Sequence, residues 1–229
     1  MAVAVRSLFV FFLLLAIKAT SRVFYRHEVA WVGDAPEERW KGLRLVALLN
    51  HTSLFELLYL GDAPLRLLWA IASRGVIPAA QKTVERPLVG LLYRLVASQV
   101  VSITRERDHT WSALLGAIRP DGLVVMAPEG RMMRETGLDA TGRQMSIRGG
   151  IADVLHALGS GGFLIAYSGG LHHVQVPGRF PRAFKTVRLR LERIDIAAYV
   201  KSLGEGLDAD AFKRAMKDDL QRRRELYCS

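Results

Sequence analysis

The chain has 229 residues, and half of them are hydrophobic, which is enough to bury a core and excludes an intrinsically disordered protein. Its 32 lysines and arginines exceed the 22 acidic residues and give a formal net charge of +10, which favours an anionic partner such as nucleic acid, a membrane surface or an acidic carrier protein. The single cysteine, Cys228, excludes an internal disulfide framework.

The N-terminal segment points to a membrane. Leu8 to Ile17 is an unbroken apolar run that covers, as a helix, roughly half of a ~30 Å hydrocarbon core. A signal peptide, a short spanning helix and a helix embedded in one leaflet are the alternatives, and Lys18 lies where a signal peptide needs a small residue. We expect a leaflet-embedded helix that anchors the protein at the cytoplasmic face of a membrane. The residues expected at the lipid headgroups are Lys18, Arg22, Tyr25, Arg26 and Trp31.

The expected organisation is therefore a membrane-associated segment, 1–30, followed by a single domain, 31–229. Strands are predicted, in chain order, over 43–49, 67–72, 100–104, 123–127, 163–167 and about 187–191. Helices are predicted over 53–60, 87–97, 108–118, 151–158 and 209–226, the first of them opened by the capping-box pair Ser53 and Glu56. Strands interleaved with helices indicate an α/β fold, and we expect a mixed, mostly parallel sheet flanked by helices.

Residues 48–56, with the sequence LLNHTSLFE, carry the first candidate chemistry. A strand end delivers His51 into a turn beside free backbone N–H groups, and a helix with Glu56 follows at once. Histidine suits proton transfer near neutral pH, and Glu56 could fix its tautomer through one ring nitrogen while the other takes a proton from a hydroxyl. The alternative is structural: Glu56 closes a capping box onto Ser53, and His51 is a polar residue that ends a strand.

Two further strand ends carry charged groups. Their residues are Glu129, Gly130, Arg131 and Arg134 in 127–137, and Arg105 and Arg107 in 100–108. Ligand sites of open α/β sheets lie at the carboxyl ends of strands, so we expect these groups near His51. Arginine binds phosphate by planar, bidentate hydrogen bonds, and the set therefore fits a phosphorylated acceptor, whereas each arginine alone could be a solvated surface charge.

In combination and order, these segments resemble the motifs of the glycerolipid acyltransferase superfamily, whose best-known members are the lysophosphatidic acid acyltransferases. Residues 50–56 (NHTSLFE) are similar to Asn-His-x-Ser-x-x-x-Asp, with Glu as the acidic residue and two residues between it and Ser53. Residues 101–105 (VSITR) resemble the second block, and 127–133 (APEGRMM) the third, Phe-Pro-Glu-Gly-Thr-Arg-Ser. Residues 86–90 (RPLVG) and 147–150 (IRGG) are similar to the Pro-Leu-x-Gly and Phe-Lys-x-Gly of the family. The likeness covers about residues 43–168.

The departures bear on the subfamily and the acceptor. Glu56 makes the first motif similar to the His-x-x-x-x-Glu of the lipid A late acyltransferases. Met132 stands where the family has an arginine, so either Arg131 or Arg134 replaces that arginine, or the acceptor lacks the usual phosphate. Residues 163–167 lack the proline of the family's fourth block.

The resemblance implies an O-acyltransferase that moves a fatty acyl group from acyl-coenzyme A or acyl-carrier protein to a hydroxyl of a lysophospholipid or related lipid. It implies no acyl-enzyme and no cofactor. His51 would act as general base and Glu56 would orient it, with either backbone N–H groups of the turn or an arginine holding the oxyanion. Substrate-binding roles are implied for Asn50, Ser53, Arg105, Glu129, Gly130 and Arg131. The alternative is a catalytically silent, membrane-bound lipid-binding protein of the same fold.

Three other kinds of function are disfavoured. A hydrolase is disfavoured because no Gly-x-Ser-x-Gly elbow surrounds Ser53. Nucleic-acid binding is disfavoured because the basic residues are spread through all segments without interleaved aromatic residues. A metal site is not expected, since the adjacent His172 and His173 would point to opposite faces of a strand.

Overall fold

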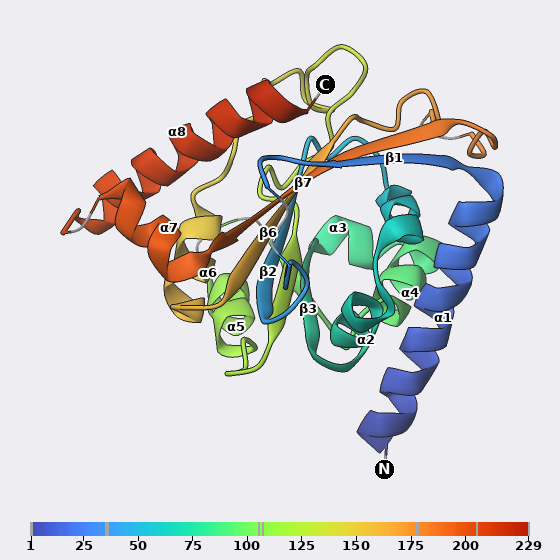
Figure 1. The fold of residues 1–229 in the computed structure, drawn as a ribbon, viewed down its shortest axis with the longest axis horizontal. Helices are drawn as coiled ribbons and strands as arrows, with labels where there is room; N and C mark the ends of the chain where they lie inside the picture. The colour runs from blue at the N-terminus through green and yellow to red at the C-terminus, as the bar shows by residue number, and fades with distance from the viewer. Residues whose placement is uncertain are drawn as a thin grey trace.

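The computed structural model describes residues 2–34, 37–104, 106, 108–176, 179–204 and 206–228. Across these residues, seven strands form one sheet in the order β1-β7-β6-β2-β5-β3-β4 (Figure 1). The strands are β1 Arg26–Trp31, β2 Leu43–Leu49, β3 Gly75–Ala80, β4 Gln99–Ile103, β5 Leu123–Met126, β6 Gly162–Ser168 and β7 Thr186–Asp195. Neighbouring strands are parallel except β6 and β7, so the prediction of a mixed, mostly parallel sheet is confirmed.

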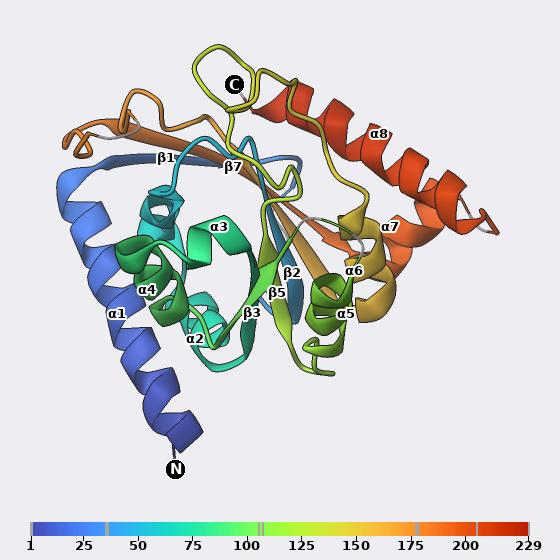
Figure 2. The same ribbon diagram turned by 180° about the vertical axis from the view of Figure 1, so that it is seen from behind.

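Helices cover both faces of the sheet, as Figures 1 and 2 show from opposite sides. They are α1 Ala2–Phe24, the 3₁₀ helix η1 Glu56–Asp62, α2 Leu65–Arg74, α3 Gln81–Val84, α4 Pro87–Leu95, α5 His109–Gly116, α6 Gly150–Leu158, α7 Ile196–Leu203 and α8 Ala209–Tyr227. Helices α1 and α2, with η1, share one hydrophobic core with the sheet, and α6, α7 and α8 share another on the opposite face. The helices predicted near the positions of α4, α5, α6 and α8 are confirmed.

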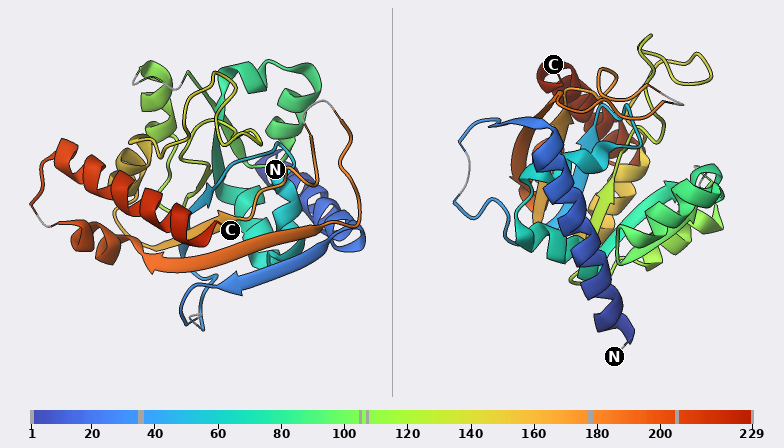
Figure 3. Two further views of the ribbon diagram at one scale, coloured as in Figure 1. Left: turned by 90° about the horizontal axis from the view of Figure 1, so that it is seen from above. Right: turned by 90° about the vertical axis from the view of Figure 1, so that its right-hand side faces the viewer.

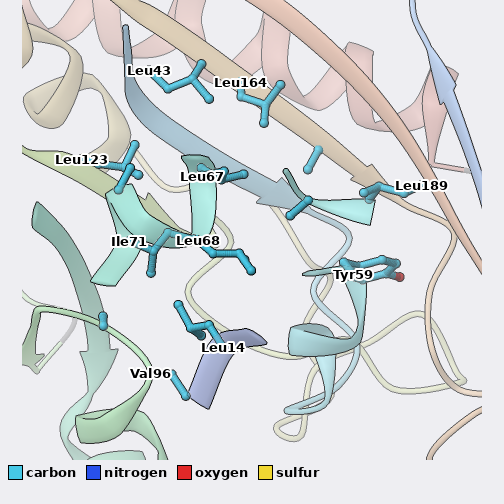
Figure 4. Close-up of a cluster of buried hydrophobic side chains, with 14 of the residues drawn as sticks. Leu14, Leu43, Tyr59, Leu67, Leu68, Ile71, Val96, Leu123, Leu164 and Leu189 are labelled. Carbon is cyan, nitrogen blue, oxygen red and sulfur yellow. The ribbon is translucent and has the colours of Figure 1, made fainter. Parts of the chain in front are cut away.

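Strand β2 lies in the middle of the sheet and is covered on both faces. Leu43 packs in the core beneath α1 and α2, part of which Figure 4 shows, whereas Leu45 and Leu49 pack in the core beneath α6 and α8. This two-sided burial explains why β2 is apolar at every position except Arg44 instead of alternating apolar and polar residues. It also fixes the carboxyl end of β2, where His51 follows.

Helix α1 extends beyond the apolar run seen in the sequence. The segment Val3–Phe24 is long and apolar enough, by length and composition, to cross a membrane. Its inward face contributes Val10 and Leu14 to the core, and its outward face exposes Phe9 and Phe12. Figure 3 shows α1 along the outside of the molecule. One helix therefore serves as part of the core and presents an apolar surface outward.

Some elements differ from their predictions. Residues 67–72, predicted as a strand, lie within helix α2. The prediction was wrong because a short run of apolar residues has no periodicity that separates a buried helix from a buried strand. The helix expected from Ser53 begins later, at Glu56, and is 3₁₀. Strands β1 and β3 are additional, and the interior Pro78 of β3 is tolerated because β3 pairs with β5 only at Gly75 and Val76.

Candidate active site

Asn50 bends the chain sharply at the carboxyl end of β2. Its φ of 66° lies in the left-handed region, which asparagine tolerates better than most other residues. Its side-chain amide donates a 2.9 Å hydrogen bond to the carbonyl of Ser168, at the end of the adjacent strand β6. Asn50, for which the resemblance implied substrate binding, is thus buried and shapes the turn that carries His51.

The His51 ring and the Glu56 carboxylate are in direct contact. His51 Nδ1 lies 2.5 Å from Glu56 Oε2, and the two side chains are 16% and 11% exposed. The other carboxylate oxygen of Glu56 accepts from the backbone N–H groups of Thr52 and Ser53, at 2.8 and 3.4 Å. The catalytic and structural interpretations of Glu56 are therefore compatible, because each uses a different oxygen.

A second carboxylate, that of Glu129, bonds the backbone of the same turn. Its oxygens accept from the backbone N–H groups of Asn50 and His51 at 2.7 and 3.0 Å, and its side chain is fully buried. Arg224, near the end of α8, places its Nε 3.0 Å from the same carboxylate. Burial raises the pKa of Glu129, while the Arg224 guanidinium opposes that rise. Glu129 therefore holds the turn, and it is also among the residues that line the adjacent cavity.

These contacts use the backbone donors that were expected to hold an oxyanion. The N–H groups of residues 50 and 51 donate to Glu129, and those of residues 52 and 53 donate to Glu56. All four therefore point at carboxylates of the protein itself rather than into the open space beside the turn.

Two arginines line the space beside this turn. Arg131 is held by an ion pair with Asp139 and a 3.2 Å hydrogen bond to the Thr141 hydroxyl. Arg148 also lines the cavity, and among the described residues its guanidinium has no ion-pair or hydrogen-bond partner. Gly130, whose φ of 67° favours glycine, brings the backbone close to Arg148. Arg105 lies outside the described residues.

Ser53 does not face His51 as a nucleophile would. Its hydroxyl donates to Gln175 Oε1 at 3.0 Å and accepts from the backbone N–H of Phe55 at 3.0 Å. The side chain is buried, with 1% of its surface exposed. Ser53 therefore ties the turn to the segment that follows β6, which agrees with the low expectation of a serine hydrolase.

A cavity of about 880 Å³ opens beside His51 and Glu56. All seven strands of the sheet contribute lining side chains, from Val29 on β1 to Ile103 on β4. Because neighbouring strands are about 4.8 Å apart, the cavity crosses roughly 29 Å of sheet. The turn that carries His51 lies between its two ends.

The two ends of the cavity differ in chemistry. Toward β1 the walls are mostly apolar, with Leu189, Leu191 and Trp31, on which Trp40 packs edge-to-face. The exception is Arg39, whose guanidinium lies over the Trp31 ring, 5.4 Å from its centre. Toward β3 and α6 the lining includes Arg131 and Arg148. Trp31, which the sequence suggested at lipid headgroups, ends β1 and lines this cavity. An apolar chain and a polar head thus find different surroundings on either side of His51.

Several contributors to the site could not be identified from local sequence. Arg224 lies in a run of three arginines on α8, and nothing in that run distinguishes it from Arg222 or Arg223. Gln175 carries no motif at all. In the part of the chain that the structure describes, no group of three or more His, Cys, Asp or Glu side chains is placed to hold a metal ion.

Comparison with known proteins supports the fold through structure rather than sequence. No protein-family model matches the sequence, and no curated protein matches it significantly. Among solved structures, the chain is similar to the 1-acyl-sn-glycerophosphate (LPA) acyltransferase PlsC from Thermotoga maritima. The TM-score is 0.53 and the sequence identity 17%, over 96% of this chain and 85% of that one. The chain therefore has the same fold as a known acyltransferase, including a mostly parallel sheet flanked by helices.

Proposed function

We propose that this protein is a membrane-associated O-acyltransferase that transfers a fatty acyl group from a thioester donor to a hydroxyl of a lysophospholipid or related lipid. The observation that carries the proposal is the 2.5 Å contact between His51 Nδ1 and Glu56 Oε2 beside a largely apolar cavity of about 880 Å³. A histidine oriented by a carboxylate is the arrangement that a general base needs. The shared fold with PlsC supports the same reaction class.

In the proposed reaction, His51 Nε2 removes the proton of the acceptor hydroxyl as that oxygen attacks the thioester carbonyl. The carbon–oxygen bond forms, the carbon–sulfur bond then breaks, and the imidazolium returns its proton to the departing thiolate. Glu56 fixes the ring with Nδ1 protonated and stabilises the imidazolium in between. A positioned general base contributes typically about 10²- to 10⁴-fold in rate.

The two ends of the cavity suggest where each substrate lies. From β2 to β1 the sheet spans three strand spacings, or roughly 14 Å, close to the ~15 Å of one leaflet of a bilayer's hydrocarbon core. The acyl chain is therefore assigned to the apolar end at Trp31 and Trp40. The acceptor head is assigned to the end that carries Arg131 and Arg148.

Arg148 is the proposed donor to the oxyanion or to an acceptor phosphate. Arg148 is an exposed residue at the cavity lining and its guanidinium lacks a partner among the described residues, whereas Arg131 is already paired with Asp139. The donor is proposed to be acyl-coenzyme A or acyl-carrier protein, both of which are acidic and suit a net charge of +10. Helix α1 is proposed to anchor the protein at the cytoplasmic face of the membrane.

The test is thioester release by purified protein in detergent with a panel of lysolipids, and product identification by mass. We expect His51→Ala and Glu56→Gln each to lower kcat by about 10²- to 10⁴-fold. His109→Ala is the matched control, because His109 is exposed at the start of α5 and should leave kcat unchanged.

Wild-type activity in a folded His51→Ala protein would end the proposed mechanism. A wild-type protein that binds acyl lipids but releases no thiol with any acceptor would instead support the catalytically silent lipid-binding protein. Free fatty acid formed without a lysolipid would indicate hydrolysis.

A further inference from the structure

We propose that residues 179–185, here called the aromatic–basic loop, form a second membrane-binding element that contacts an anionic bilayer beside the end of α1. The loop precedes β7 and has the sequence RFPRAFK. The proposal deepens the membrane association of the proposed function by naming another contact surface and the charge of the lipid that it binds. It does not depend on turnover.

The aromatic side chains of the loop face solvent to an unusual degree. Phe180 is 95% exposed and Phe184 is 72% exposed. Phe184 also has a φ of 60°, a conformation that is a genuine outlier for a bulky residue. Large aromatic rings are normally covered, and rings that are not covered in water commonly mark an interface. Backbone strain of this kind also clusters at functional segments.

The loop is fastened to the end of the apolar helix. The backbone N–H of Phe184 donates to the Phe24 carbonyl at 2.6 Å, and their rings lie 6.0 Å apart. The backbone N–H of Arg26 donates to the Lys185 carbonyl at 3.1 Å. Figures 1 and 3 both show the segment before β7 beside the end of α1. The exposed phenylalanines of the loop are thus continuous with an exposed apolar helix.

The loop also carries positive charge that the protein does not neutralise. Arg179, Arg182 and Lys185 are exposed, and none has an acidic partner among the described residues. Arg26, also exposed, adds a further positive charge next to them. Each basic residue close to an anionic leaflet strengthens binding by roughly fivefold. The sequence RFPRAFK does interleave basic and aromatic residues, which corrects the statement made from the sequence that no segment does so. This composition is typical of interfacial membrane contacts.

An anionic bilayer fits this surface better than an acidic protein. A carrier protein would satisfy the charges but would leave the exposed apolar residues of α1, such as Phe9 and Phe12, uncovered. A bilayer covers both at once. Residues that precede the loop reach the candidate active site: the Ser53 hydroxyl donates to Gln175 Oε1, and the Leu171 N–H donates to the Thr52 hydroxyl. The loop is therefore connected, through the residues just before it, to the turn that carries His51.

The experiment places a fluorescent probe at the tip of the loop in the full-length protein. Cys228, the only cysteine, is first replaced by Cys228→Ser. Phe180→Cys is then introduced and labelled with an environment-sensitive dye. The labelled protein is reconstituted into phosphatidylcholine bilayers with and without phosphatidylglycerol, each containing spin-labelled lipids as quenchers. The same dye at Leu207→Cys, an exposed position between α7 and α8, is the control for a site away from the membrane.

We expect quenching at position 180 in bilayers that contain phosphatidylglycerol, with little quenching at position 207. Arg179→Gln, Arg182→Gln and Lys185→Gln together should abolish the dependence on phosphatidylglycerol. Lys201→Gln, Arg214→Gln and Lys217→Gln, which remove the same charge from α7 and α8, should retain it.

Equal and weak quenching at both labelled positions in anionic bilayers would overturn the proposal. So would a spectral change at position 180 that requires added acyl-carrier protein and is absent with lipid alone. Because the readout needs no acyl transfer, failure of this proposal and failure of the proposed enzyme activity are separate results.

Discussion

Arg224 and Glu129 connect the end of α8 to the turn that carries His51. Glu129 is fully buried and accepts from two backbone N–H groups of the turn, and Arg224 supplies the opposing charge 3.0 Å away. Glu129 bonds the backbone of the turn and Arg224 pairs with Glu129, so we assign both side chains a positioning role. The position of His51, the proposed base, therefore depends on Arg224, which lies more than 170 positions further along the chain.

Replacement of Arg224 tests that role. In Arg224→Gln, Glu129 is left buried without its cation, which typically costs about 3–5 kcal/mol of stability. We expect kcat to fall while KM for the thioester changes little, and Arg224→Lys to recover part of the loss because it keeps the charge. Steady-state kinetics of the folded variants check this, and an unchanged kcat in Arg224→Gln would contradict it.

The pair also predicts a pH dependence. Burial raises the pKa of Glu129 above its ordinary value of 4.5, and Arg224 opposes the rise. An acid whose pKa rises on folding favours the folded state below its unfolded pKa, and this stability is lost as the pH rises through the raised pKa. In Arg224→Gln the pKa of Glu129 rises further. The free energy of unfolding of this variant should therefore continue to fall with pH up to a higher pH than that of the wild type.

Urea unfolding across the acidic to neutral range measures that difference. Glu129→Gln is the reference, because it removes the titrating group and should flatten this part of the profile. Profiles of identical shape for the wild type and Arg224→Gln would show that the two groups are not coupled.

The sequence predicted the contact between His51 and Glu56 but not their supports. Five positions separate the two residues across a strand-to-helix corner, and such a short distance leaves few geometries. For Glu129 the resemblance implied only a substrate-binding role, and nothing in its motif predicted that its carboxylate bonds the neighbouring turn. Tertiary packing decides which face of α8 meets the Glu129 carboxylate, and no local sequence pattern encodes this choice.

At the scale of elements, a buried histidine joins α1 to η1. The Nδ1 of His27 lies 3.1 Å from Asp62 in η1, and its Nε2 lies 3.0 Å from the Ser21 hydroxyl in α1. Ser21 in turn donates to the Leu58 carbonyl at 2.7 Å. Because η1 begins at Glu56, the apolar helix and the element that carries the carboxylate are held together.

A methyl group at Gly61 tests this junction. A Cβ there would overlap the His27 ring, which has polar partners on both sides and little room to move. We expect Gly61→Ala to cost about 1–3 kcal/mol, as overpacked sites do. Gly116→Ala, at the end of α5 with nothing near its Cβ, should instead gain roughly 0.5–1 kcal/mol. Chemical unfolding compares them, and equal stabilities would contradict the prediction.

The sequence predicted those helices and strands in which apolar residues form a long run or cover both faces of the element. The central strand β2 and the helix α6 have such patterns and were located from sequence. The edge strand β1, with the sequence RHEVAW, was missed because three of its six residues are charged or polar and half of it faces solvent. Its place is set by pairing with β7, far away in sequence, which no window of residues can show.

For the whole molecule, α1 belongs both to the apolar outer surface and to the core. Leu14 is completely buried and also lines the cavity, whereas Phe12, nearby on the same helix, is 61% exposed. The expected division into a segment 1–30 and a domain 31–229 describes membrane association, but the core in the structure extends across that boundary. The helix should therefore be required for folding as well as for attachment.

Removal of residues 1–24 should consequently destabilise the remaining chain instead of releasing a soluble enzyme. The matched point variants are Leu14→Ala, expected to lose about 2–5 kcal/mol, and Phe12→Ala, expected to keep its stability and bind vesicles less tightly. Thermal unfolding in one detergent compares the three proteins. A truncated chain that melts with the full-length protein would show that α1 is only an anchor.

The pairing of β1 with β7 has a consequence for biosynthesis. Partners in these two strands are 160 residues apart, as for Arg188 and Glu28, so at about 5–20 residues per second the ribosome needs roughly ten to thirty seconds between making one and the other. Val29 and Trp31 on β1, with Leu189 and Leu191 on β7, wall one end of the cavity. The cavity of a nascent chain can thus be completed only late in translation, long after helix α1 has left the ribosome.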